Sequence, residues 1–189
     1  LGLLYEYLRS NGYRVVKTRE PGGTLYSERL KEIVTSTALR CQMAELLTFE
    51  AARADIISML IKPALNEGNI VLADRYTDSS LAYQGFGRGL PLDVVMELNR
   101  IVTNGLEPDL TLLFDVPLAE DRVSDVNYFE NLGEEFQNRV RNGYLELARR
   151  NKKRIKTIRR VKGRNPEESI RRTFTERTLP AVKEFLGFS

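Results

Sequence analysis

The sequence contains no histidine, and it holds a single cysteine, Cys41, among its 189 residues. The lack of histidine excludes the most common general base and the most common zinc ligand. Any catalysis must therefore use carboxylates, lysine and arginine side chains, backbone dipoles or a hard cation. With one cysteine the chain cannot form an internal disulfide, which favours a reducing compartment, and we expect a cytoplasmic protein.

Long apolar runs are also missing from the sequence. No stretch approaches the roughly 20 residues that span a bilayer, and no segment resembles a signal peptide. We therefore expect no membrane partner.

Positive charge is concentrated in residues 149–172, where only Glu167 and Glu168 oppose a dense set of lysines and arginines. Such a segment either binds phosphate groups or forms a solvated face. No aromatic side chain interrupts it, although aromatic rings that stack on bases are typical of proteins that bind single-stranded nucleic acid. We expect no nucleic-acid partner, and a nucleic-acid-binding protein with steeply salt-dependent affinity stays as an alternative.

Apolar periodicity and the positions of glycine and proline predict alternating helices and strands. The predicted helices cover residues 1–10, 25–34, about 43–66, 79 onward, 91–103, about 134–150 and 165 onward, and the predicted strands cover 13–18, 70–73, 110–116 and 155–158. The strands are continuous apolar runs, which is typical of a parallel sheet with helices on both faces. We expect one α/β domain over residues 1–189, whose ligands bind beyond the carboxyl ends of the strands.

Two unusual motifs follow the first two predicted strands. Asp74 and Arg75 come directly after the strand 70–73, and REPGGT, from Arg19 to Thr24, follows the strand 13–18. Asp74 and Arg75 form either a surface ion pair or a ligand site, in which aspartate holds a hydrated Mg²⁺ and arginine binds phosphoryl oxygens. REPGGT is either a plain type II turn or a close approach of backbone to an anion at the next helix.

Helical spacing groups two further sets of side chains. Phe49 and Arg53 are four residues apart and share a face, either as core residues or as a pair that stacks on a base and donates to its carbonyl. Ser80, Tyr83 and Gln84 also share a face, which is either exposed to solvent or directed at the polar edge of a ligand.

The chain closely resembles the bacterial thymidylate kinase family in five segments, which occur in the family's order and spacing: TREPGGT, LLTFEAARAD, DRYTDSSLAYQGFGRGL, PDLTLLFDVP and RVRNGYLELA. The resemblance covers nearly the whole chain and weakens after Ile158. It implies a three-layer P-loop kinase fold and transfer of the γ-phosphoryl group of ATP to dTMP, which gives dTDP. It also implies Mg²⁺ as cofactor and a homodimer.

The resemblance implies roles for the residues that match the family's dTMP site. Phe49 would stack on thymine, and Arg53 would bond its O4. Ser80 and Gln84 would lie at the edge of the pyrimidine. Tyr83 would crowd the 2′ position of the sugar and so favour deoxyribose.

At the phosphate end, the resemblance implies that Arg75 binds the acceptor phosphate and bridges towards the donor. Asp74 would lie near Mg²⁺ and hold it through water. The residues that would line the acceptor phosphate are Pro21 and Gly22, with Glu20 or Arg19 assisting. Phosphoryl transfer by such a site needs no histidine, because it depends mainly on positioning and charge neutralisation.

The family's Walker A loop does not occur in the printed sequence. In the family this loop follows an apolar strand and holds the phosphates of ATP. We expect roughly 15–20 further residues ahead of Leu1 to supply the strand and the loop. This strand would lie centrally in the sheet, between the strands that end at Ala73 and at Val116.

The predicted lid, about residues 120–135, departs from the family pattern, because Tyr128 stands where an arginine is common. Arg122 is the remaining arginine of the lid, and we expect it to take part in catalysis. Arg139 and Arg141 follow on the next predicted helix.

An ATP-dependent thymidylate kinase is the leading interpretation, and two related alternatives stay open. A catalytically inactive relative would bind dTMP without ATP turnover. A deoxynucleoside kinase would phosphorylate the sugar hydroxyl, and it would need a carboxylate base where this chain offers arginines for a phosphate.

Overall fold

The computed structural model describes residues 1–36, 41–116, 129 and 132–187. The chain divides into two compact units. Unit 1 consists of Leu1–Glu107 and Asp125–Tyr144, and unit 2 consists of Pro108–Ser124 and Leu145–Ser189. The prediction of a single domain over residues 1–189 stays a prediction.

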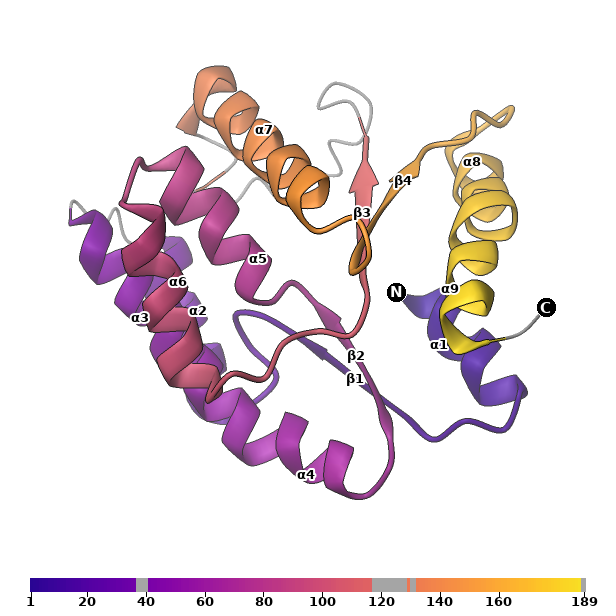
Figure 1. Cartoon of the computed structure of the whole chain (residues 1–189), viewed down its shortest axis with the longest axis horizontal. Helices are drawn as coiled ribbons and strands as arrows, with labels where there is room; N and C mark the ends of the chain where they lie inside the picture. Colours follow the sequence, from indigo (N-terminus) through magenta and orange to yellow (C-terminus); the bar gives the residue numbers. More distant parts are fainter. Residues whose placement is uncertain (37–40, 117–128, 130–131, 188–189) are drawn as a thin grey trace. The chain divides into compact units, whose positions relative to one another are not determined.

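Unit 1 contains two strands and most of the helices, and its elements follow the predicted order. They are α1 (Gly2–Ser10), β1 (Val15–Arg19), α2 (Leu25–Ser36), α3 (Gln42–Ile56), η1 (Ile57–Ile61), α4 (Lys62–Asn66), β2 (Ile70–Asp74), α5 (Thr77–Ser80), η2 (Leu81–Gly87), α6 (Leu92–Thr103) and the first part of α7 (Glu134–Arg150). Helices α2, α3 and α6 lie side by side (Figure 1).

The long helix predicted for residues 43–66 is divided into α3, the π-helical segment η1 and α4. Pro63 lies near the start of α4, directly after η1. Because proline has no N–H and its ring crowds the preceding turn, it disturbs the regular α-helical hydrogen bonds just before it. Helix α6 ends at Asn104, which adopts the left-handed conformation with φ 52°, as the Asn-Gly signal in the sequence predicts.

Strands β1 and β2 pair in parallel, from Val15 opposite Ile70 to Arg19 opposite Asp74. The backbone N–H of Glu20 donates to the carbonyl of Asp74 at 2.9 Å. The register therefore brings the REPGGT turn beside Asp74 and Arg75 at the carboxyl edge of the pair, where parallel sheets bind their ligands.

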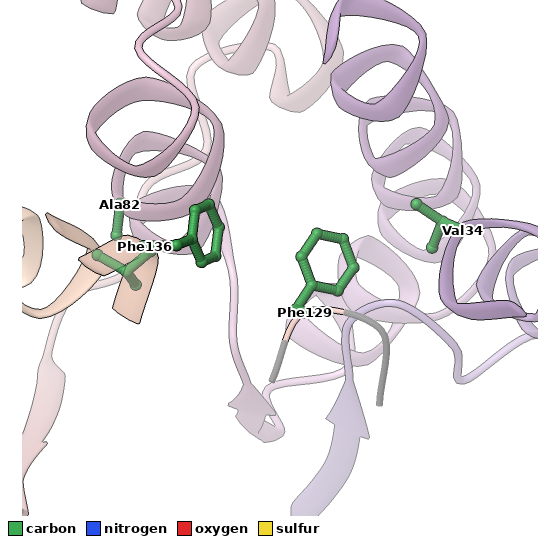
Figure 2. Close-up of a cluster of buried hydrophobic side chains, with 5 residues drawn as sticks. Val34, Ala82, Phe129 and Phe136 are labelled. Atoms are coloured by element: carbon green, nitrogen blue, oxygen red, sulfur yellow. The ribbon is translucent and has the colours of Figure 1, made fainter. Parts of the chain in front are cut away.

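Two apolar clusters among the described residues contribute to the core of unit 1. The first contains buried residues from α2, η2, the segment at residue 129, and α7 (Figure 2): Val34, Ala82, Phe129, Phe136 and Val140. Phe49 and Tyr83 are partly buried and pack against this cluster. The second cluster contains Ile56, Ile57 and Ile61. Phe49 and Tyr83 thus border the first cluster, whereas Arg53, Ser80 and Gln84, which were also predicted to bind the nucleoside, are each only 2% exposed.

Unit 2 contains the second pair of strands. Strands β3 (Thr111–Asp115) and β4 (Ile155–Arg159) pair in parallel, and α8 (Pro166–Thr173), η4 (Phe174–Thr178) and α9 (Leu179–Leu186) follow β4. The side chain of Asn165 caps α8 by accepting from the N–H of Glu168 at 2.8 Å, as the Asn-Pro-Glu-Glu sequence predicts.

The parallel strand pairing and the alternation of helices and strands confirm the α/β class. Among the described residues, the strands form two pairs rather than the one sheet that the sequence predicts. The apolar strands are also less buried than expected: β2 has no fully buried residue, and Phe114 of β3 is 50% exposed. A two-stranded sheet accounts for this exposure, because both strands are edges. No helix within the described ranges is long and apolar enough to cross a bilayer.

Candidate active site

The backbone of Arg75 has an unusual conformation directly after β2. Its φ is 70°, in the left-handed region that side chains other than glycine rarely adopt. Such conformations cost about 1–3 kcal/mol and are frequent at functional sites. Asp74 and Arg75 both lie in the described part of the chain, and no ion pair joins them. The Arg75 guanidinium carbon instead lies 5.1 Å from the centre of the Tyr83 ring.

The REPGGT turn holds a carboxylate from the following helix. Glu28 of α2 accepts a hydrogen bond from the N–H of Gly23 at 2.9 Å and from the Arg19 guanidinium at 2.9 and 3.2 Å. The hydrogen bond from Gly23 lowers the pKa of Glu28, and Arg19 lowers it further. The backbone of this turn and Arg19 therefore hold the carboxylate of the chain's own Glu28, and the binding of a ligand anion at this motif stays a prediction.

Two glycines make this close approach possible. Gly22 has a φ of 128°, and a Cβ atom there would lie 2.5 Å from Oε1 of Glu28. At Gly23 a Cβ atom would lie 2.6 Å from Oγ1 of Thr18. Pro21 precedes them after a cis peptide bond with Glu20. The turn therefore has no room for other residue types at these two positions.

Arg53 lies at the centre of a buried polar cluster. Its side chain is 2% exposed, and its Nη2 forms an ion pair with Oε2 of Glu20 at 2.7 Å. Its Nη1 contacts Oε1 of Glu50 at 2.6 Å, Oδ1 of Asn99 at 2.7 Å and Oγ of Ser80 at 3.0 Å. The structure thus joins Arg53 and Ser80, which the sequence placed in separate motifs, and it adds Glu50 and Asn99.

Gln84 belongs to a second buried cluster. Its side-chain amide donates to Oε1 of Glu45 at 3.0 Å, and Glu45 is completely buried. The guanidinium of Arg88 forms two hydrogen bonds with the same carboxylate, at 2.7 and 3.2 Å. Gln84 therefore has a protein partner, in addition to the ligand contact predicted for it.

Aromatic rings form a continuous wall in unit 1. The ring centre of Phe129 lies 5.7 Å from that of Phe49 and 5.8 Å from that of Tyr83. Tyr83 also approaches Phe136 at 6.1 Å and Tyr144 at 6.3 Å. Phe49 is only partly buried, so one part of its ring remains available to a planar ligand.

Tyr144 supports this wall through a polar contact. Its hydroxyl donates to Oγ of Ser79 at 2.8 Å. Burial raises the pKa of Tyr144 to about 12, although Arg75 acts in the opposite direction. The hydroxyl is therefore protonated at neutral pH and serves as a hydrogen-bond donor.

The arginines predicted near the lid differ in their surroundings. Arg122 lies outside the described residues. The Nε of Arg139 donates to the carbonyl of Gly87 at 3.0 Å, and its Nη1 pairs with Glu135 at 2.7 Å. Arg139 thus links α7 to η2.

Part of the positive charge in the basic segment 149–172 is paired locally. Glu146 contacts both Arg149 and Arg150, and the hydrogen bonds from these two arginines lower its pKa to about 2. Arg171 pairs with Glu167 at 2.8 Å.

Sequence reasoning missed Glu50, Asn99, Glu45 and Arg88 as parts of the polar clusters. Glu50 precedes Arg53 by three residues, a spacing at which helix side chains meet, so the signal was present. Asn99 and the pair Glu45–Arg88 carry no such signal, because their partners are distant in sequence.

Comparison with known proteins agrees with this geometry. The family model described as thymidylate kinase matches residues 1–171. The chain is 45% identical over 160 residues to the thymidylate kinase of Synechococcus sp. (strain JA-3-3Ab), a match that covers 82% of this chain and 78% of that protein. It is 41% identical over 163 residues to the thymidylate kinase of Sulfurihydrogenibium sp. (strain YO3AOP1), covering 84% and 80% of the two chains.

A solved structure shows the same fold. The crystal structure of thymidylate kinase from Ehrlichia chaffeensis matches with a TM-score of 0.80 and 32% sequence identity, and the match covers 96% of this chain and 89% of that chain. The fold is therefore that of the P-loop nucleoside monophosphate kinases. Within this class, the chain belongs to the thymidylate kinase family.

Proposed function

We propose that the described site is the dTMP-binding half of a kinase, which uses Phe49, Arg53, Tyr83 and Arg75 to hold the acceptor nucleotide. Membership of the thymidylate kinase family makes the chain an enzyme that transfers a phosphoryl group from ATP to dTMP. The observation that carries the site proposal is the 3.0 Å hydrogen bond between Arg53 and Ser80, since it joins two residues to which the family resemblance gives contacts with the base.

In the proposed complex, the base lies against the exposed part of Phe49, and Arg53 donates to a carbonyl oxygen of the pyrimidine. Tyr83 lies beside the sugar. The ring of Tyr83 also faces the guanidinium of Arg75. Gln84 lies near the edge of the base. Aromatic stacking contributes about 1–3 kcal/mol per base, and a charge-assisted hydrogen bond adds a similar amount.

The phosphate of dTMP would lie between Arg75 and the REPGGT turn. The N–H of Gly23 and the guanidinium of Arg19 donate to the carboxylate of Glu28, which supports an anion-binding role for the turn that contains Pro21 and Gly22. In the reaction, an oxygen of the acceptor phosphate attacks the γ-phosphorus of ATP, and the bond to the β–γ bridging oxygen breaks. Arg75 would neutralise charge that spreads over the transferred group.

Asp74 is the residue we propose for Mg²⁺, through water. It is exposed at the carboxyl edge of β2, and Mg²⁺ often uses one or two carboxylates and keeps several waters. When bound, the ion supplies charge neutralisation at the phosphates of ATP. Arg122 is the arginine we propose for the lid.

We also propose a homodimer and a cytoplasmic location. Large apolar side chains are exposed on neighbouring helices of unit 1: Leu47 of α3, Met59 of η1, and Met96 and Ile101 of α6. Exposed apolar patches of this kind are typical of association surfaces. The single cysteine supports a reducing compartment.

One assay tests the function and the site together. ADP release is followed with Mg-ATP and dTMP, dUMP, thymidine or no acceptor. We expect turnover with dTMP, a loss of about 100-fold in kcat for Arg75→Ala, and mainly a rise of about tenfold in KM for Phe49→Ala. Arg100→Ala is the control, because its ion pair with Glu97 is exposed.

Two results would contradict the proposal. If Arg75→Ala and Phe49→Ala keep the kinetics of the parent, the residues do not form the acceptor site. If dTMP binds without any ADP release, the chain as tested does not carry out phosphoryl transfer.

A further inference from the structure

The guanidinium of Arg53 is almost fully occupied by protein acceptors. An arginine side chain has five N–H groups: one on Nε and two on each Nη. Nε donates to Oε2 of Glu20 at 2.9 Å, and Nη2 contacts the same oxygen at 2.7 Å. The three acceptors of Nη1 are Glu50, Asn99 and Ser80.

This arrangement leaves one N–H of Arg53 without a protein acceptor among the described residues. The three acceptors around Nη1 use both of its hydrogens, and Glu20 uses the hydrogen of Nε and one hydrogen of Nη2. For the second hydrogen of Nη2 there is no acceptor among the described residues. Arg53 therefore presents a single remaining N–H, in an orientation that four protein side chains determine.

The cluster carries more negative than positive charge. Two carboxylates, Glu20 and Glu50, flank one guanidinium, and their side chains are only 6% and 2% exposed. Within the described part of the chain, Oε1 of Glu20 and Oε2 of Glu50 have no hydrogen-bond partner. Burial raises the pKa of Glu20, and the charge of Glu50 raises it as well, while Arg53 opposes the shift. Such surroundings keep the guanidinium charged, so Arg53 can donate and cannot accept.

We propose that Glu50 and Asn99 are positioning residues that determine pyrimidine specificity through Arg53. They hold Nη1, and with Glu20 they leave only the last N–H of Nη2 for the base. This inference rests on the proposed function of Arg53 as a contact to dTMP. A donor in one orientation favours a pyrimidine with a carbonyl oxygen at that position, such as thymine or uracil. It disfavours cytosine, whose amino group is itself a donor.

The physical basis is preorganisation. An arginine on a solvated surface loses side-chain entropy when it binds, whereas this one is already ordered before any ligand arrives. A site built around a fixed donor also rejects a ligand that lacks the matching acceptor, because the donor would then stay unpaired. Loss of Glu50 or Asn99 would remove one of the three acceptors of Nη1 and so weaken the constraint on the orientation of the guanidinium.

The test is the ratio of two dissociation constants, for dCMP and for dTMP, measured by titration calorimetry. The variants are Glu50→Gln, which removes the charge with little change in shape, and Asn99→Ala, which leaves both ion pairs of Arg53 intact. The control is Glu97→Gln on the exposed side of α6, the helix that carries Asn99. We expect the ratio of the dCMP to the dTMP dissociation constant to fall about tenfold in Glu50→Gln, which corresponds to about 1.4 kcal/mol. In the control we expect this ratio to stay unchanged.

A merely structural role gives a different result. Partial unfolding lowers the number of binding sites and affects both nucleotides equally, so the ratio of dissociation constants does not change. If the parent prefers dTMP and both variants keep its ratio, the inference is wrong while the proposed function stands. If the parent itself binds dCMP as well as dTMP, the proposed function of Arg53 fails. Should Glu50→Gln not fold, Asn99→Ala alone decides, with a fall of about threefold or more expected for the loss of one hydrogen bond.

Discussion

Replacement of Arg53 by methionine tests the electrostatic account of the buried cluster. Methionine has a similar length and no charge, so the variant removes the cation between Glu20 and Glu50 and leaves two buried carboxylates unpaired. Removal of one partner from a buried ion pair costs about 3–5 kcal/mol. Because a domain of this kind is stable by about 5–15 kcal/mol, the loss would be a large part of the total.

The loss should also depend on pH. Arg53 lowers the pKa of Glu20 against the raising effect of burial. Without Arg53 the pKa of Glu20 in the folded variant rises further above its unfolded value. At pH values between the unfolded-state pKa and the folded-state pKa of Glu20, the folded state binds more protons than the unfolded state. The free energy of unfolding therefore falls as pH rises through this range. The variant should therefore lose more stability at pH about 7 than at pH about 5.

The measurement is urea unfolding of parent and variant, followed by far-ultraviolet circular dichroism at both pH values. Arg100→Met is the matched control. Its ion pair with Glu97 also measures 2.6 Å, but the side chains are 67% and 54% exposed. We expect this control to change the stability little, because an ion pair between exposed side chains contributes little. A loss below about 1 kcal/mol for Arg53→Met at neutral pH, or an equal loss at both pH values, would refute the reasoning.

Two further predictions concern packing and capping. Gly143→Ala should destabilise the protein by about 1–3 kcal/mol in thermal or urea unfolding, because the new Cβ would lie 2.7 Å from Cβ of Phe86. Gly2→Ala, with no atom within 4 Å, serves as its control, and an equal effect of both substitutions would show that Phe86 is not the cause. Asn165→Ala should cost about 1 kcal/mol, because the N–H of Glu168 loses its capping acceptor, and Asn165→Asp should retain most of the stability. An unchanged unfolding midpoint in Asn165→Ala would contradict the assigned cap.

Local signals in the sequence were sufficient for the elements and for part of the site. All four strands were predicted within a few residues, and the bounds of α7 agree with the prediction. These predictions succeed because hydrophobic period, glycine and proline act over a few neighbouring residues. Helical spacing also predicted shared faces for Phe49 with Arg53 and for Ser80 with Gln84. In the structure Phe49 packs against an apolar cluster while Arg53 lies in the buried polar cluster, and Ser80 and Gln84 bond to different partners.

The partners of these side chains could not be predicted from local signals. Arg53 of α3 meets Glu20 from a turn 33 residues earlier, Ser80 of α5 27 residues later and Asn99 of α6 46 residues later. Nothing in the local pattern distinguishes these acceptors from other polar residues. The π-helical segment η1 and the partial exposure of Phe114 were missed for the same reason, because they depend on neighbours in space.

The sequence by itself determined the class of fold and the order of its helices and strands, and it predicted which side chains would bind a nucleotide. Tertiary structure decided which of these side chains are buried and what each of them contacts. The physical reason is that the charge and hydrogen-bond capacity of a residue are local properties. The acceptors that bond to the guanidinium of Arg53, in contrast, come close to it only when α3, α5, α6 and the REPGGT turn pack together.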